Sequence, residues 1–195
     1  MNNYAIGKEK IMESFEIKGF KKWVGREGYG AQGTVYQNGF KIAFVTDEGN
    51  GGNIDVVWQH LNSKTVVTKF LAKLPSYTWG EYYPLASDID DENRIWDFET
   101  FGDVMLQFGE YQQNFKKAMN KVCYIPDQDF YGIMKTTYTK KELDNLIWLS
   151  CFKVAVKNRY PKSTILNLLD VDKAFALWMK YSVVDASQNG QPITK

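Results

Sequence analysis

Carboxylates are the side chains of this sequence whose number and spacing suggest chemistry. Nine of them lie between Glu81 and Glu110, where Arg94 is the only cation, although the whole chain of 195 residues has a net charge of only +1. A run of one charge sign is typical of a cation site, of a surface for a basic partner or of a solvated loop. The first two interpretations name residues that experiments can test.

The spacing within residues 88–99 matches a twelve-residue calcium loop, whose ligands at positions one, three, five and twelve would be Asp88, Asp90, Glu92 and Glu99. Two features oppose this interpretation. Asn93 replaces the glycine that is usual at position six, and Pro84 interrupts the helix that should precede the loop. Ca²⁺ at this site, or Mg²⁺ at a carboxylate pair of a metal-dependent hydrolase or nuclease, is therefore an alternative. Our leading interpretation has no cofactor.

Aromatic side chains are interspersed with these carboxylates, and the combination favours a protein-contact surface. Carboxylates spaced along a surface reproduce the charge row of a nucleic-acid backbone, and aromatic rings add contact area against a basic groove. We therefore expect the segment to contact a partner protein with a basic groove. The residues expected to make that contact are Trp79, Tyr82, Tyr83, Asp88, Asp90, Asp91, Glu92 and Trp96.

The scarcity of histidine and cysteine excludes several kinds of active site. His60 is the only histidine, and Cys123 and Cys151 are the only cysteines. Zinc sites built from Cys and His clusters are therefore excluded, and a Ser-His-Asp or Cys-His arrangement is disfavoured. We name no catalytic residue. We expect His60 to be structural or at the surface, and both thiols to be buried and free.

Direct nucleic-acid binding is the weaker alternative. Lys21, Lys22 and Arg26 accompany Trp23, and aromatic side chains on a sheet can stack on bases. The first 42 residues nevertheless have a net charge of only +3, which is common on ordinary sheets. The glycine-rich segments 25–33 and 49–52 lack the motifs of phosphate-binding loops, so we expect both to be hairpin turns.

The elements that must position these residues begin with a β-rich half, residues 14–59. Apolar and polar residues alternate there with turn signals between them, which predicts an antiparallel meander of about four strands. Asn38 and Gly39 predict a type I′ hairpin turn, since both readily adopt positive φ angles. We expect the first strand to bend at Gly19.

The rest of the chain, residues 63–182, is expected to be helical. Ser63 can cap a first helix that ends before Pro75, and further helices are predicted over 103–121, 139–160 and 164–181. Thr139 and Glu142 form a capping box at the start of the helix predicted over 139–160. The broad apolar surface of this helix predicts that it lies at the centre of the C-terminal half. An irregular acidic aromatic loop over 75–100 and a flexible tail over 185–195 complete the expected organisation.

These features predict an α+β fold in one domain over residues 1–195, because strands come first and helices follow. No segment offers about 18 apolar residues for a membrane span, and residues 1–10 lack the apolar run of a signal peptide. We therefore expect a cytoplasmic protein without membrane contact.

Three segments resemble small uncharacterised proteins of bacteriophages and other mobile elements: Phe15–Phe20, Gly25–Gly28 and Val45–Gly52. The resemblance covers about a quarter of the chain and transfers no functional residue. It implies a small protein that binds a host protein, in some cases a nuclease or another defence system. Together with the acidic aromatic segment, it favours a non-enzymatic inhibitor of a host defence or nucleic-acid-handling complex.

Overall fold

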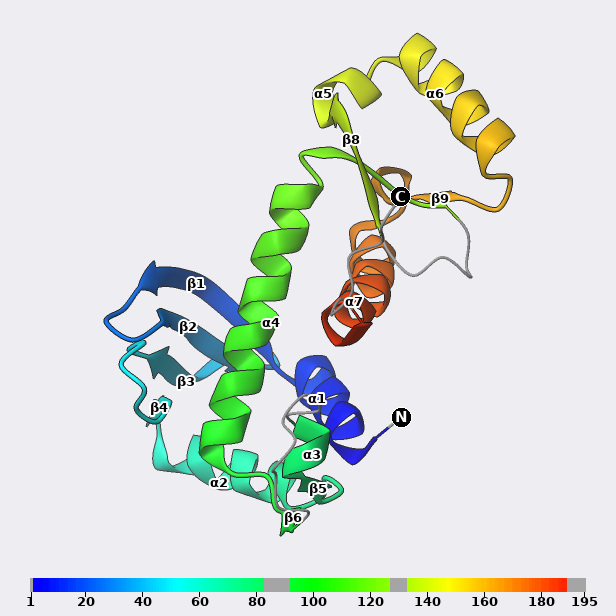
Figure 1. Ribbon diagram of the computed structural model, residues 1–195. Helices are drawn as coiled ribbons and strands as arrows, with labels where there is room; N and C mark the ends of the chain where they lie inside the picture. Colours follow the sequence, from blue (N-terminus) through cyan, green and yellow to red (C-terminus); the bar gives the residue numbers. More distant parts are fainter. Residues whose placement is uncertain (1, 83–91, 127–132, 189–195) are drawn as a thin grey trace. The chain divides into compact units, whose positions relative to one another are not determined.

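The computed structural model describes residues 2–82, 92–126 and 133–188, which form helices and strands in both halves of the chain (Figure 1). Length and composition predict one domain. The chain instead divides into two compact units, Met1–Glu110 and Tyr111–Lys195. Each unit has a hydrophobic core of its own. In the described part of the chain, no helix combines the length and the apolar character needed to cross a membrane.

The first unit is built on a four-stranded antiparallel sheet in the order β1 (Glu16–Val24), β2 (Tyr29–Gln37), β3 (Phe40–Asp47) and β4 (Asp55–Trp58). This confirms the predicted meander and, with the helices that follow, the α+β class. Asn38 and Gly39 have φ angles of 51° and 81° at the β2–β3 turn, as a type I′ turn requires. The predicted bend is also present, because Gly19 has a φ of 67° where the β1–β2 register shifts.

Three helices cover the core of this unit: α1 (Asn3–Ser14), α2 (Leu61–Leu71) and the first part of α4 (Phe98–Ala118). α4 approaches the sheet closely, since a Cβ added at Gly102 would lie 2.7 Å from Ile54, and one at Gly109 would meet the Phe20 ring. The sequence patterns did not predict α1. α2 begins two residues before Ser63, with His60 at the N-cap position, so the predicted Ser63 cap is wrong.

Part of the segment expected to be an irregular loop is ordered secondary structure. β5 (Tyr77–Thr78) pairs with β6 (Asn93–Arg94), and the short helix α3 (Trp79–Tyr82) follows β5 directly. α4 then begins at Phe98, five residues before the predicted helix start at Asp103. The backbone of this segment is therefore held by strand pairing and helix ends.

The second unit contains a sheet that the sequence patterns did not predict. β7 (Lys121–Ile125) lies between β8 (Met134–Thr139) and β9 (Thr164–Ile165), so the mostly helical second half also contains three short strands. Asn167 holds this sheet: its Oδ1 accepts from the Cys123 N–H at 2.7 Å, and its Nδ2 donates to the Lys121 carbonyl at 2.9 Å. These contacts join residues more than 40 positions apart, which a local pattern does not reveal.

The helices of the second unit also differ from the prediction. The helix expected over 139–160 is divided into α5 (Lys140–Leu143) and α6 (Leu146–Arg159), and the turn η1 (Leu166–Leu168) precedes α7 (Val171–Gln188). The capping box is confirmed, because the Thr139 N–H donates to Glu142 Oε2 at 2.6 Å. α6 is not the central helix we expected, since most of its described side chains are exposed.

Cys123 is buried and Cys151 is exposed, and neither forms a disulfide. The prediction of free thiols is therefore confirmed, whereas the predicted burial of Cys151 is wrong because this residue lies on the exposed face of α6. Residues 189–195 of the predicted tail lie outside the described part, and residues 185–188 belong to α7.

Candidate functional site

The acidic aromatic segment is built around five aromatic side chains, which we call the aromatic cluster: Tyr4, Tyr77, Trp79, Tyr82 and Trp96. The ring of Tyr4 stacks on Trp96 with centroids 5.4 Å apart, and Tyr77 lies 4.9 Å from the same indole. Trp96 is only 6% exposed, and its Nε1 donates to the Pro75 carbonyl at 2.8 Å. Trp96 is therefore a core residue and not the surface anchor that the sequence suggested.

α1 contributes Tyr4 to this cluster. Its buried residues Tyr4, Gly7 and Ile11 lie on one face, and a Cβ at Gly7 would overlap the Trp96 ring. Glycine thus allows the helix backbone to lie directly against the indole. The helix is capped locally by Asn2, whose Oδ1 accepts from the Ala5 N–H, and it packs against a residue 89 positions away.

Glu81 joins α1 to α3 through its carboxylate. Oε2 accepts from the Thr78 N–H at 3.0 Å, and the Glu81 N–H donates to Thr78 Oγ1 at 3.3 Å, which forms a capping box. Oε1 accepts from the Asn3 N–H at 2.9 Å, at the positive end of α1. The three-residue spacing of Thr78 and Glu81 is a sequence signal for this helix start, which was not predicted.

A second carboxylate, Asp103, belongs to a largely buried polar chain. Tyr82 Oη and Gln107 Nε2 each donate to Asp103 Oδ2 at 2.6 Å, and Lys8 Nζ donates to Gln107 Oε1 at 2.6 Å. Burial raises the pKa of Asp103, while Tyr82, Lys8 and Gln107 oppose that rise. Burial also lowers the pKa of Lys8, against the attraction of Asp103. The Tyr82 hydroxyl is thus committed to the fold, although its ring is partly exposed.

An apolar groove of about 440 Å³ lies on the border of this segment, between the end of α2 and the residues that lead into α4. Its lining residues are Thr68, Leu71, Ala72, Leu74, Ser76, Ile95, Trp96, Asp97 and Phe98. Ile95 is 79% exposed, so a large apolar side chain stands at the rim of an apolar hollow. Ile95 is not among the contact residues predicted from charge and aromatic content.

The other carboxylates of the segment fall into two groups. Asp97 accepts from the Thr100 N–H at 2.8 Å and caps α4, and Glu110 forms an ion pair with Lys22 at 2.7 Å. Glu92 and Glu99 are exposed. The remaining predicted contact residues, Tyr83, Asp88, Asp90 and Asp91, lie outside the described residues.

The predicted metal ligands are consequently not seen together. Asp88 and Asp90 are outside the described part, while Glu92 precedes β6 and Glu99 lies in the first turn of α4. Within residues 2–82, 92–126 and 133–188, no three His, Cys, Asp or Glu side chains are grouped so that they could hold a metal ion. A Ca²⁺ or Mg²⁺ site stays a prediction.

The residues of the nucleic-acid alternative point in different directions. Lys21 and Trp23 alternate with Lys22 along β1, and successive strand residues face opposite sides of a sheet. Lys22 is paired with Glu110, and Arg26 with Glu27 at 2.8 Å. The structure thus divides this set over two faces and neutralises two of its three cations.

Comparisons of the chain with models of protein families, with curated proteins and with solved structures give no match.

Proposed function

We propose that the chain is a non-enzymatic protein-binding module whose contact surface combines residues 77–103 with the groove that they form with the end of α2. The observation that supports this best is the apolar groove with Ile95 at its rim. A contact core of this kind buries an apolar anchor of the partner, and a polar or charged rim surrounds it.

The charge of the segment indicates the chemistry of the partner. Asp97 lines the groove and is exposed, and Glu92 and Glu99 are exposed in the same segment. Asp88, Asp90 and Asp91 add three carboxylates in the same stretch of sequence. A partner segment that combines an apolar anchor with flanking Lys or Arg side chains would therefore complement the surface.

Trp79 supplies a second contact on this surface. It is partly exposed on α3, and the Arg94 guanidinium lies over its ring at 5.1 Å. Glu81 links α3 to α1 through the Asn3 N–H, and a side chain held in place by the fold loses less entropy on binding. The resemblance to bacteriophage proteins favours a bacterial partner, namely a defence or nucleic-acid-handling protein that binding would inhibit.

The test is affinity capture from a nuclease-treated bacterial lysate with three baits: the natural chain, Ile95→Ser and Leu61→Ser. Leu61 is a matched control, because it is 82% exposed and does not line the groove. We expect a protein retained by the natural chain and by Leu61→Ser. Its affinity for Ile95→Ser should be lower by at least about tenfold, since a buried aliphatic side chain contributes about 1.5–3 kcal/mol.

Charge is tested separately with the triple reversal Asp90→Lys, Asp91→Lys and Glu92→Lys. We expect loss of the same partner with an unchanged far-UV circular dichroism spectrum, and weaker capture by the natural chain at high salt. Equal retention of the partner by all baits would overturn the proposed surface.

A further inference from the structure

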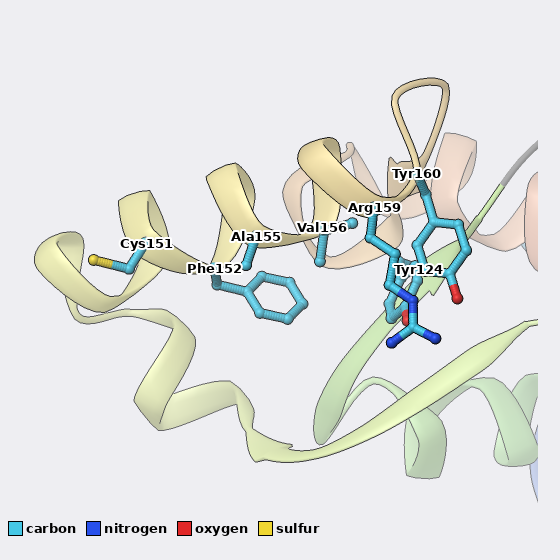
Figure 2. A pocket seen from close by; sticks show the side chains of 7 residues that line it. All are labelled: Tyr124, Cys151, Phe152, Ala155, Val156, Arg159 and Tyr160. Atoms are coloured by element: carbon cyan, nitrogen blue, oxygen red, sulfur yellow. The ribbon is translucent and has the colours of Figure 1, made fainter.

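The second unit contains a pocket that is separate from the proposed contact surface. It has a volume of about 360 Å³ and lies between β7 and α6. Its lining residues are Tyr124, Cys151, Phe152, Ala155, Val156, Arg159 and Tyr160 (Figure 2). The volume is at the lower end of the range for small-molecule sites, so the pocket suits one ring system with a short polar extension.

Three aromatic rings form much of the wall. Phe152 and Tyr160 lie 6.3 and 6.0 Å from Tyr124 between ring centroids, and all three rings are partly exposed. Figure 2 shows the Phe152 ring directed along α6 toward the two tyrosines. Partly exposed rings that share one hollow offer faces on which a planar aromatic ligand can stack.

The polar groups of the pocket gather at one end. Arg159 is close enough to Tyr124 to act on its pKa, and the side chains of Arg159, Tyr124 and Tyr160 lie at the same end of the pocket in Figure 2. Arg159 lies over the Tyr160 ring at 5.5 Å and has no ion-pair partner among the residues that the structure describes. A guanidinium is a fork of N–H donors that matches the geometry of a phosphate, and phenol hydroxyls can donate to the same oxygens.

Tyr124 keeps its proton at neutral pH. Burial raises the pKa of Tyr124, Tyr160 raises it further, and Arg159 opposes the rise. Both the cation and the neutral hydroxyl of Tyr124 therefore favour a negatively charged group at this end of the pocket.

We infer that this pocket binds a nucleotide, with the base against Tyr124, Phe152 and Tyr160 and the phosphate on Arg159. The aromatic rings and the guanidinium line the same pocket, so one ligand can contact both. The ligand has two sources with the same chemistry: a free mononucleotide, or one nucleotide of a single strand. This site is independent of the groove beside Ile95, so either proposal can fail without the other.

The experiment is a calorimetric titration of the full chain with AMP, GMP, CMP and UMP, with adenosine, and with a single-stranded oligonucleotide. Arg159→Gln removes the guanidinium, and Lys153→Gln is the matched control, since Lys153 is exposed on the same helix and does not line the pocket. We expect Arg159→Gln to weaken nucleotide binding by about ten- to hundredfold, as for loss of a charge-assisted hydrogen bond. Lys153→Gln should bind like the natural chain.

The ligands separate the possible outcomes. Saturable binding of a mononucleotide that is sensitive to Arg159→Gln supports the free ligand, and binding of the oligonucleotide alone with the same sensitivity supports the single strand. Adenosine should bind less tightly than AMP in the natural chain and equally tightly in both variants. No saturable binding of any nucleotide, or equal affinities of Arg159→Gln and Lys153→Gln, would overturn the inference.

Discussion

Tyr82→Phe deletes a hydroxyl that donates a hydrogen bond to the partly buried carboxylate of Asp103. Tyr82 Oη donates to Asp103 Oδ2 at 2.6 Å, within the range of short hydrogen bonds to charged acceptors. A hydrogen bond to a charged group contributes about 1.5–3 kcal/mol. We expect the variant to lose about that much free energy of unfolding at about pH 7.

The loss should depend on pH in a defined direction. Burial raises the pKa of Asp103 in the folded chain, so its contribution to stability is fully present below the unfolded-state pKa and is lost as pH rises through the folded-state pKa. Tyr82 lowers that pKa, and its removal therefore raises the pKa further. At about pH 7, Tyr82→Phe removes a donor from a charged carboxylate, and the destabilisation should be larger. At about pH 4 the carboxyl group is more nearly neutral, and loss of the same hydrogen bond should cost only about 1 kcal/mol.

Urea unfolding of the full chain, followed by circular dichroism at both pH values, measures this difference. Tyr29→Phe is the control, because Tyr29 is 65% exposed and its phenyl ring would still lie under Lys22. In an Asp103→Asn background, Tyr82→Phe should cost the same at both pH values. A loss equal to that of the control, or a loss that does not change with pH in the Asp103 chain, would refute the role assigned to this hydrogen bond.

Two further predictions concern burial. Gly7→Ala places a Cβ against the Trp96 ring and should destabilise the chain by about 1–3 kcal/mol in urea unfolding, whereas Gly28→Ala, which meets nothing within 4 Å, should change it little; equal effects would contradict the packing of α1. Cys151 is exposed and Cys123 is buried, so iodoacetamide should modify Cys151 first and Cys123 only after denaturant is added; mass spectrometry showing equal rates would contradict the placement of these thiols.

Local signals predicted the parts of the fold that local physics determines. Asn38 and Gly39 adopt positive φ, Gly19 lies at the bend in β1, and Thr139 caps with Glu142, as their residue types indicate. Each of these features depends on backbone preferences or on contacts within a few residues. Fold class followed from the order of such signals along the chain.

Long-range contacts determine the rest, and for that reason the sequence did not reveal it. α1 packs through Gly7 against Trp96, and the sheet of the second unit depends on Asn167 reaching the backbone at Lys121 and Cys123. Charge along the sequence also does not show which carboxylates turn inward. Asp103, one of the nine carboxylates of the acidic stretch, contacts a phenol and an amide and lies near a lysine.

The most direct test of the central claim is photo-crosslinking from the rim of the groove. A benzophenone amino acid is placed at Ile95 in one chain and at Leu61 in another, and both are irradiated in nuclease-treated bacterial lysate. The proposed function predicts one dominant adduct from position 95, with a crosslinked peptide rich in Lys and Arg around an apolar residue, and no such adduct from position 61. The same adducts from both positions, or none from position 95 while the natural chain still captures its partner, would contradict it.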